Sequence, residues 1–219
     1  MKGSPATNGE GDLAFPQSLA EKYRPVRIAD FIGLERPKRV LSALLRRPAS
    51  GAWLFLGPSG VGKSTMALAL ATELQAEIHK IPSQKCNVQS IEDTVRRCWY
   101  APMTPGGVHI VLADEADQMT DAAQLALLSK LDSTDPAPNT IWVFTANGTE
   151  RLERRFLSRC KALEFSSYGL AGEIAAYLDR IWHAEGGNLN HPDFERLAKD
   201  SRNNVRDCLM RLEVELMAL

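Results

Sequence analysis

The sequence contains only four cysteines, and these form no CxxC pair, which argues against a zinc ribbon or a disulfide framework. It also lacks an apolar run of the roughly 20 residues that a transmembrane helix needs, and its first residues lack the charged-then-apolar order of a signal peptide. A net charge of -1 argues against a surface that is basic throughout, so any contact with nucleic acid must be local. We therefore expect reduced thiols, a cytoplasmic location and no membrane contact.

The composition that remains is that of a globular protein. A chain of 219 residues with 44% hydrophobic and 24% charged residues can bury one large core, or a medium core and a small one. Residues 1–17 are rich in Gly, Ser, Pro, Asn and Thr, which predicts a flexible N-terminal tail. The ordered part of the chain is expected to begin at residue 18.

Short apolar runs alternate with helical patterns over residues 18–167. Strands are expected over residues 53–56, 78–81, 108–113 and 140–146. Helices are expected between and before them, over residues 36–47, 63–74, 90–99 and 121–131. Ser90 and Asp93 form the capping-box pattern at the start of the third helix. Strands separated by helices predict a parallel sheet with helices on both faces, so this part is an α/β domain.

From Tyr168 onward the sequence carries no strand signal. Three helices are expected there, over residues 170–183, 192–199 and 204–217. Gly186 and Gly187 follow the first of these helices, and residues 200–203 separate the other two. Residues 168–219 are therefore predicted to form a small helical domain behind the α/β domain.

The stretch GPSGVGKST fits the pattern G-x-x-x-x-G-K-[ST] and lies directly between an apolar strand and a helix. In such a loop the backbone N–H groups and the helix N-terminus surround phosphate oxygens. Lys63 would reach the β and γ phosphates of ATP, and the Ser64 hydroxyl would be a ligand of Mg²⁺. A chance glycine turn is the alternative, but the flanking strand and helix disfavour it. The phosphate-binding residues are predicted to be Gly57, Pro58, Ser59, Gly60, Val61, Gly62, Lys63, Ser64 and Thr65.

Asp114 and Glu115 end the apolar run in VHIVLADEADQM. A parallel strand would deliver both carboxylates to the edge of the sheet where the phosphate loop lies. Asp114 could hold Mg²⁺, and Glu115 could orient or deprotonate a water molecule that attacks the γ-phosphate. Adjacent carboxylates at a strand end are otherwise a solvated tip, and the phosphate loop makes that reading the weaker one.

For Asn147 and Arg159, a purely structural role is a good interpretation, and the residues alone do not decide between it and a functional role. Asn147 ends the run IWVFTAN, where an amide can cap a turn or can position a water molecule between the γ-phosphate and Glu115. Arg159 lies in FLSRC, where an arginine can simply be a solvated charge at a helix end.

Taken in order, these motifs resemble the clamp-loader family of AAA+ ATPases, which includes replication factor C small subunits and the bacterial polymerase III gamma/tau subunit. The resemblance covers residues 19–219 and rests on AEKYRP, ADFIGLE, GPSGVGKST, ADEADQMT with AAQLALL, FTAN and FLSRC. It implies a P-loop AAA+ sheet flanked by helices, followed by a three-helix lid. It also implies an ATPase that uses Mg²⁺ and couples ATP turnover to the loading of a sliding clamp on DNA.

The resemblance assigns roles to further residues. AEKYRP would place Tyr23, Arg24 and Pro25 near the adenine. FTAN maps sensor 1 onto Asn147, and SRC maps onto Arg159 an arginine finger that acts on the ATP of a neighbouring subunit. NNVRD resembles the sensor 2 segment and favours Arg206, with Arg202 as the rival assignment.

Departures from the family pattern limit these implications. Bacterial gamma/tau subunits have a cysteine zinc module before the acidic strand, whereas this sequence has only Cys86 and Cys98 there, so zinc is not expected. The segment between Lys130 and Asn139 differs from the usual helix end. The sequence ends at Leu219, after the lid, where clamp loaders continue into a collar. Either it is a piece of a longer protein, or its subunits assemble through their ATPase faces alone.

The expected partners are other AAA+ subunits, a sliding clamp and primer-template DNA. Lys80, Lys85, Arg96 and Arg97 are the candidate contacts to the DNA backbone, and a solvated basic helix face is an equally good reading. Two alternative functions stay open. The chain could be an ATP-gated scaffold that hydrolyses poorly, or another AAA+ remodeller such as a helicase loader.

Overall fold

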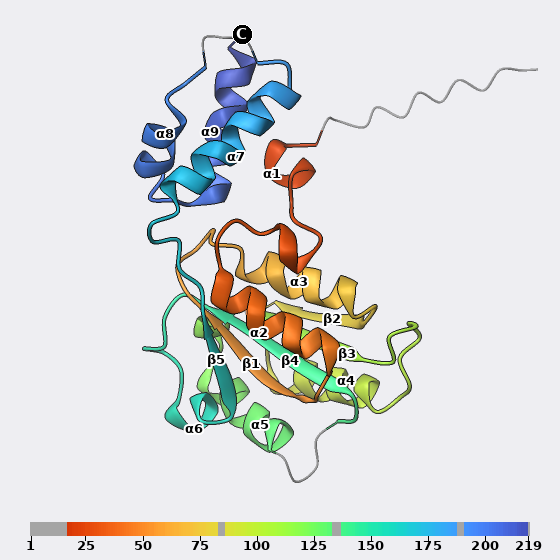
Figure 1. Cartoon of the computed structure of the whole chain (residues 1–219). Helices are drawn as coiled ribbons and strands as arrows, with labels where there is room; N and C mark the ends of the chain where they lie inside the picture. Colours follow the sequence, from red (N-terminus) through yellow and green to blue (C-terminus); the bar gives the residue numbers. More distant parts are fainter. Residues whose placement is uncertain (1–16, 83–85, 133–136, 188–190, 219) are drawn as a thin grey trace, which may run out of the picture.

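The computed structural model describes residues 17–82, 86–132, 137–187 and 191–218. Residues 1–16 of the expected tail, Lys85, and residues 133–136 of the divergent segment lie outside the described residues. Within the described ranges, five parallel strands form one sheet in the order β2-β3-β4-β1-β5 (Figure 1). The strands are β1 (Gly51–Leu56), β2 (Glu77–Pro82), β3 (His109–Asp114), β4 (Thr140–Ala146) and β5 (Cys160–Glu164).

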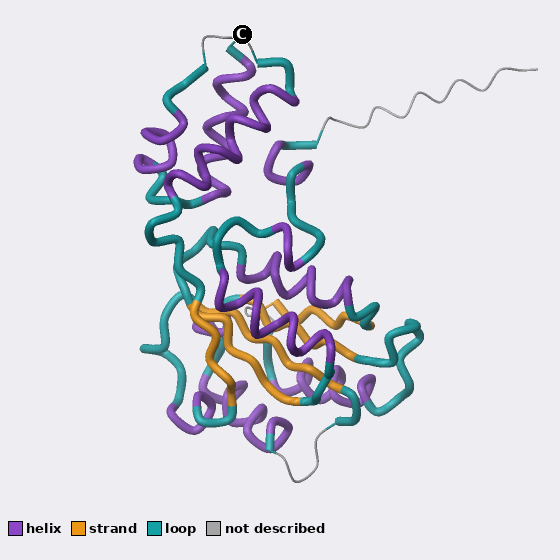
Figure 2. Tube along the Cα trace, in the orientation of Figure 1, coloured by secondary structure: helices purple, strands orange, loops and turns teal. Residues whose placement is uncertain are grey.

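Helices cover both faces of the sheet, as Figure 2 shows by the helical segments on either side of the strands. On one face lie α2 (Glu35–Arg46) and α3 (Lys63–Glu73), whose buried residues share a core with the 3-10 helix η1 (Ile28–Asp30). On the other face lie α4 (Val88–Cys98), α5 (Asp121–Leu131) and α6 (Arg154–Leu157), together with η3 (Ala116–Gln118). The predicted α/β architecture is confirmed.

The central strand β4 is buried along its whole length, as its apolar and β-branched sequence TIWVFTA predicts. Phe144 stacks on Trp142 with ring centroids 5.9 Å apart and meets the edge of Phe156 at 4.9 Å. The strand therefore forms a fixed framework, and its carboxyl end and that of β3 emerge at the same edge of the sheet.

The predicted start of the helix at Ser90 is wrong. The cap of α4 is Asn87, whose side chain accepts a hydrogen bond from the Ser90 N–H at 2.9 Å. The Ser90 hydroxyl accepts in return from the Asn87 N–H at 3.0 Å. Asn at the cap and Ser at the third helical position thus form the reciprocal pair, so α4 begins earlier, at Val88.

Strand β5 was not predicted from the sequence. It pairs only with β1 in the described sheet, and of its five residues only Leu163 is buried. An edge strand with so little buried surface carries almost no hydrophobic alternation to read. FLSRC does contain the end of the short helix α6, at Leu157, but the chain then enters the sheet at Cys160.

Three helices follow the sheet, as predicted: α7 (Ala171–Ala184), α8 (Phe194–Asp200) and α9 (Val205–Met217). They enclose a separate core around Trp182, and the short helix α1 (Leu19–Lys22) contributes the buried Leu19 to the same core. The division into residues 18–167 and 168–219 remains a prediction, and α1 packs with the second part. Among the described residues, no helix combines the length and apolar character that crossing a bilayer requires.

Candidate nucleotide site

The glycine-rich loop connects the end of β1 to the first residue of α3, as predicted. Gly60 and Gly62 have φ angles of 77° and 99°, which glycine adopts without the steric cost that other residues meet. A Cβ atom on Gly60 would also lie 2.1 Å from the Asn204 Oδ1 atom. The loop can therefore pass directly beneath the start of α9 only because this position is glycine.

Lys63 is buried, and its ammonium group points back into the loop. The Nζ atom donates to the carbonyl oxygens of Gly57 at 2.6 Å and Pro58 at 2.8 Å, and to Asn147 Oδ1 at 3.0 Å. Burial lowers the pKa of Lys63, and the Asp114 carboxylate opposes that shift. The side chain of Asn147 is thus adjacent to the lysine, as the sequence-based site requires.

Asp114 accepts two short hydrogen bonds at the end of β3. Ser64 Oγ donates to Asp114 Oδ1 at 2.5 Å, and Thr145 Oγ1 donates to the same oxygen at 2.5 Å. Thr145 Oγ1 also accepts from the Glu115 N–H at 3.0 Å. One buried hydroxyl therefore orients the backbone of one predicted catalytic residue and the carboxylate of the other.

Glu115 has a left-handed backbone, with φ 56° and ψ 49°, and its side chain is exposed. Such a conformation costs a non-glycine residue roughly 1–3 kcal/mol, and the hydrogen bond to Thr145 helps to hold it. The strained turn separates the two acidic side chains, so that Asp114 faces Ser64 while Glu115 is free to meet a ligand.

Two pockets meet at the glycine-rich loop. The first is polar, and its lining includes Lys63, Ser64, Asp114, Glu115 and Asn147. The second is largely apolar, and it is lined from the N-terminal segment, the loop and the helical region by Tyr23, Arg24, Pro25, Phe31, Val61, Tyr177, Val205 and Leu209, among others. Gly60, Gly62, Thr65 and Arg206 line both pockets. An apolar pocket that continues into a phosphate loop matches the two ends of a nucleotide.

Tyr23 connects this apolar pocket to the helical region. Its hydroxyl donates to Glu185, which also forms an ion pair with Lys22 at 2.8 Å. The hydrogen bond to Glu185 raises the pKa of Tyr23 to about 12. Tyr177 donates to the Tyr23 carbonyl oxygen at 3.0 Å. The ring of Tyr23 lines the pocket while its hydroxyl is held by the segment after α7.

The helical region also reaches the loop through Asn204, the cap of α9. Its side chain accepts from the Asp207 N–H at 3.2 Å and donates to the Ser59 carbonyl oxygen at 3.2 Å. Arg206 follows on the first turn of α9 and lines the polar pocket, whereas Arg202 lines a neighbouring hollow and does not line that pocket. Of the two rival arginines, Arg206 is the one placed toward the phosphate site.

Arg159 lies elsewhere, at the start of β5. Its guanidinium contacts Asp132 Oδ2 at 3.3 Å and the Arg155 carbonyl oxygen at 3.0 Å. It does not line either pocket. Cys160 pairs with Ala52, four residues before the strand end at Leu56, so Arg159 lies roughly 13 Å or more from its own phosphate loop along the strand.

Sequence reasoning missed Thr145 and the contact of Asn204 with the loop. Thr145 stood in the quoted motif FTAN, and it is a polar residue near the end of an otherwise apolar, fully buried strand. That pattern is a usable signal, because a buried hydroxyl needs a partner. The Asn204 contact joins residues 145 positions apart in the chain, and no local pattern could indicate it.

Residues 53–168, more than half of the chain, match the protein family described as the ATPase family associated with various cellular activities (AAA). The chain belongs to the AAA family of ATPases. This match contains both acidic residues, Asn147, Arg159 and the whole glycine-rich loop.

Curated relatives of this AAA chain are replication factor C small subunits, in agreement with the resemblance inferred from the motifs. Replication factor C small subunit 1 of Pyrobaculum arsenaticum is 31% identical over 201 residues, covering 89% of this chain and 60% of the relative. The small subunit of Methanocella arvoryzae is 28% identical, covering 92% of this chain and 64% of the relative. The chain thus spans less than two thirds of the length of these relatives.

Solved structures with the same fold include Thermotoga maritima RuvB, described as a Holliday junction branch migration motor. It superposes with a TM-score of 0.71 at 24% sequence identity, covering 87% of this chain and 64% of RuvB. A point variant of the same protein gives a TM-score of 0.73 at 23% identity. These likenesses establish the AAA fold, including the helical region behind the sheet.

We predict that Thr145→Val will lower the free energy of unfolding by about 1–3 kcal/mol, because it leaves the Glu115 N–H without its acceptor and removes one of the two donors to Asp114. Valine keeps the shape of the side chain, so the loss reports on the hydroxyl alone. Thr145→Ser is the matched control and should retain more of the stability than valine. Urea denaturation of the three proteins measures the effect, and equal stability of the valine variant and wild type would contradict it.

Proposed function

We propose that this chain binds Mg·ATP across the two adjoining pockets and hydrolyses it. The observation that carries the proposal is that an apolar pocket and a polar pocket meet at the glycine-rich loop. The lysine and serine of this loop and the neighbouring carboxylates are the residue types that phosphoryl transfer needs. The adenine would occupy the pocket between Tyr23 and α9, and the phosphates would lie over the start of α3.

The residues around the phosphates would have different roles. Lys63 exchanges its contacts with loop carbonyls for phosphate oxygens, which an ammonium with three donors can satisfy. Ser64 and Asp114 present adjacent oxygen atoms, the ligand type that Mg²⁺ prefers, so they would hold that ion. When bound, Mg²⁺ neutralises charge on the β and γ phosphates.

Glu115 would be the general base, because its carboxylate is exposed at the phosphate edge and is not tied to Ser64 as Asp114 is. Asn147 lies beside Lys63 and would help to position the attacking water molecule. Arg206 would approach the phosphates from α9, so that nucleotide binding draws the helical region toward the sheet.

The biological role that fits best is that of a clamp-loader subunit that couples ATP binding to the opening or placing of a sliding clamp on primer-template DNA. The support is the set of curated relatives named replication factor C small subunits and the order of motifs shared with that family. Such a subunit would work in an oligomer of AAA subunits, with ATP binding ordering the interface and hydrolysis releasing the partners.

An arginine finger acting between subunits fits the position of Arg159. The residue lies toward the opposite edge of the sheet from its own phosphate loop, so it cannot serve its own ATP. Its ion pair with Asp132 joins two partly exposed side chains, and such pairs contribute only about 0–1 kcal/mol. The guanidinium can therefore leave Asp132 at little cost when a neighbouring subunit presents a phosphate.

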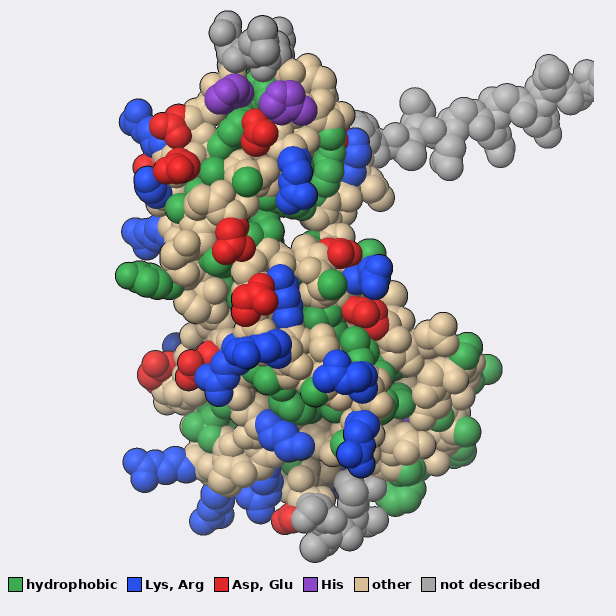
Figure 3. All heavy atoms as spheres, viewed as in Figure 1, with side chains coloured by type: hydrophobic (Ala, Val, Ile, Leu, Met, Phe, Trp, Pro, Cys, Tyr) green, Lys and Arg blue, Asp and Glu red, His purple; other side chains and the backbone are tan. Residues whose placement is uncertain are grey.

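DNA binding would use backbone phosphates and local positive charge. Arg96 and Arg97 are exposed on the last turn of α4, whereas Lys80 leaves β2 on the opposite face of the sheet from α4. On the face drawn in Figure 3, Lys and Arg side chains also gather over α2, with Asp and Glu more interspersed around the helical region. The net charge of -1 thus conceals local concentrations of positive charge.

We predict that Lys63→Ala abolishes tight ATP binding, while Glu115→Gln keeps ATP binding and loses turnover. Alanine removes the cation that faces the phosphates, whereas glutamine preserves size but cannot accept a proton from water. A fluorescent-nucleotide titration and a steady-state phosphate-release assay separate the two effects. Wild-type turnover by Glu115→Gln would show that Glu115 is not the base, and unchanged affinity of Lys63→Ala would refute the phosphate site.

We predict that ATP turnover per subunit rises with protein concentration or with added partner subunits, and that Arg159→Ala removes this rise without changing nucleotide affinity. Arginine fingers in other phosphate-loop enzymes are worth roughly 10³ to 10⁵ in rate. Arg155→Ala is the matched control, because Arg155 is an exposed arginine of α6 that contacts Arg159 only through its backbone.

Mixing Arg159→Ala with Glu115→Gln tests the action between subunits directly. One protein keeps the base without a finger, and the other keeps the finger without a base, so mixed interfaces should hydrolyse ATP although neither protein alone does. An inactive mixture whose assembly is confirmed by light scattering would refute the finger.

We predict that replacing Arg96 and Arg97 together by glutamine weakens duplex DNA binding to a similar extent on all sequences. It should also reduce the slope of log affinity against log salt by about two, because two phosphate contacts are lost. Replacing Arg196 and Lys199, an exposed pair on α8, is the matched control. Binding that is unaltered at low salt would assign Arg96 and Arg97 to a solvated helix face.

A further inference from the structure

A second cluster of chemically active side chains lies far from the nucleotide site. It is located toward the amino ends of β2 and β3, whereas the nucleotide site lies at the carboxyl end of β3. His79 comes from β2, His109 is the first residue of β3, and Cys98 is the last residue of α4. Their ligand atoms all lie within 4.8 Å of one another. Cys98 and His109 are buried, with 0% and 1% of their surface exposed, and the His79 side chain is 9% exposed.

The strand register explains why the two histidines meet. Glu77 pairs with His109 in the parallel ladder, and His79 lies two residues further along β2. Side chains two residues apart leave a strand on the same face, so Glu77, His79 and His109 all point toward α4. The end of α4 then brings Cys98 to the same place. Three elements distant in sequence thus converge on one point.

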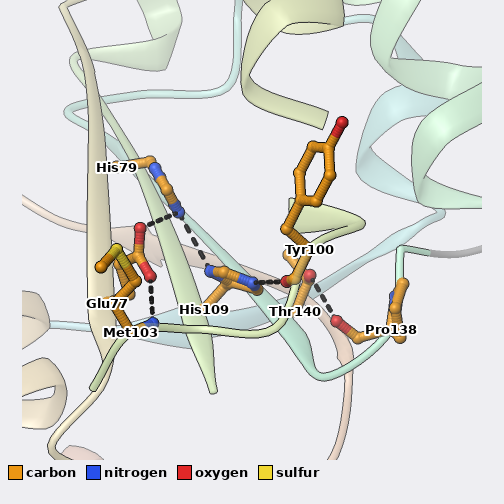
Figure 4. A network of polar contacts seen from close by, with 7 residues as sticks. All are labelled: Glu77, His79, Tyr100, Met103, His109, Pro138 and Thr140. Carbon is orange, nitrogen blue, oxygen red and sulfur yellow. Dashed lines mark hydrogen bonds and ion pairs between the residues drawn. The ribbon is translucent and has the colours of Figure 1, made fainter. Parts of the chain in front are cut away.

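The orientation of His109 is set by a backbone group. Its Nε2 atom lies 2.9 Å from the Tyr100 carbonyl oxygen, which can only accept, so Nε2 carries the proton (Figure 4). The other ring nitrogen, Nδ1, therefore presents its lone pair to the cluster, 3.1 Å from His79 Nε2. A histidine held by a carbonyl on one nitrogen and open on the other is the usual arrangement of a metal ligand.

Glu77 lies beside the cluster, next to His79. One carboxylate oxygen lies 3.9 Å from His79 Nε2, and the other accepts a hydrogen bond from the Met103 N–H at 2.8 Å, as Figure 4 shows. The carboxylate is therefore held at the rim of the cluster. It can supply an oxygen to an ion that the three other residues bind.

We propose that Cys98, His79 and His109 bind a divalent transition-metal ion of the Zn²⁺ type, with Glu77 as the fourth ligand. Two nitrogen ligands of one tetrahedral Zn²⁺ lie about 3.3 Å apart, close to the 3.1 Å between these ring nitrogens. A thiolate with two imidazoles selects zinc over magnesium or calcium, which take oxygen ligands. The cysteine count alone could not indicate such a site, because only Cys98 among the proposed ligands is a cysteine.

The ion would be structural. It would join β2, α4 and the start of β3, and so fix the end of α4 that carries Arg96 and Arg97. With Glu77 as the fourth ligand, all four coordination positions would be filled by protein, which is typical of structural rather than catalytic sites. This inference does not rest on ATP hydrolysis or on clamp loading.

Cobalt(II) tests the site in the full chain without nucleotide. The protein is stripped with a chelator under a phosphine reductant, titrated with Co²⁺ and then with Zn²⁺. We expect one Co²⁺ per chain with the strong visible absorption of a tetrahedral site and a thiolate-to-cobalt band in the near ultraviolet, both removed by Zn²⁺. Co²⁺ at Ser64 and Asp114 would lack the thiolate band, and Lys63→Ala should leave that band unchanged.

Variants identify the ligands. Cys98→Ser should lose the thiolate band, and His79→Gln should weaken Co²⁺ binding beyond the roughly 10- to 100-fold that loss of an outer partner causes. Cys208→Ser is the matched control, because Cys208 is a buried cysteine in the core of the helical region. It should bind like wild type. Zn²⁺ should also raise the melting temperature of wild type but not of Cys98→Ser.

Wild-type protein without a thiolate band, or with a band that Cys98→Ser retains, would overturn the proposal. The cluster would then be a hydrogen-bonded pair of imidazoles only, with His79 donating to His109. Because the first of these readouts uses the unmodified protein, a variant that fails to fold cannot decide the result.

Discussion

The hydrogen bonds that Asp114 accepts from Ser64 and Thr145 are the constraint on which the candidate site depends. They join the first turn of α3, the end of β3 and the end of β4, three elements that a parallel sheet brings to one edge. Thr145 also holds the Glu115 N–H, so the strained turn that separates the two carboxylates is fixed by the same hydroxyl. If any of these elements shifted, the arrangement that turns Asp114 toward Ser64 and leaves Glu115 exposed would be lost.

The apolar half of the site depends on the helical region, which the sheet alone does not provide. Asn204 caps α9 and contacts Ser59 in the glycine-rich loop, while Tyr23 is held by Glu185 and Tyr177. A ligand that fills both pockets would therefore contact residues of both parts of the chain. Differential contact of this kind is what allows a nucleotide to shift the arrangement of two domains.

The features that could be predicted from the sequence are those that depend on local sequence patterns. The loop, the acidic pair and most strands are local patterns, and the structure has them close to the predicted residues. Strand β5 was missed because an edge strand buries only Leu163, and the cap of α4 was misplaced because Ser90 could serve at the cap or at the third position. The ion pair of Arg159 with Asp132 and the contact of Asn204 with the loop depend on tertiary packing, which no local pattern encodes.

Strand β3 connects the two sites that the structure suggests. His109 begins the strand and Asp114 ends it, five residues apart, or roughly 17 Å at the rise of a β-strand. Side chains so far apart usually contribute independently to stability, so an ion at one end need not alter nucleotide affinity at the other. Both sites nevertheless lie along strand β3, whose ladder with β2 pairs Glu77 with His109 and Pro82 with Asp114. An ion bound by His79, Cys98 and His109 would fix where β2 and β3 begin. The register would then place Asp114 opposite Pro82, while the hydrogen bonds with Ser64 and Thr145 would still set its position beside the phosphate loop.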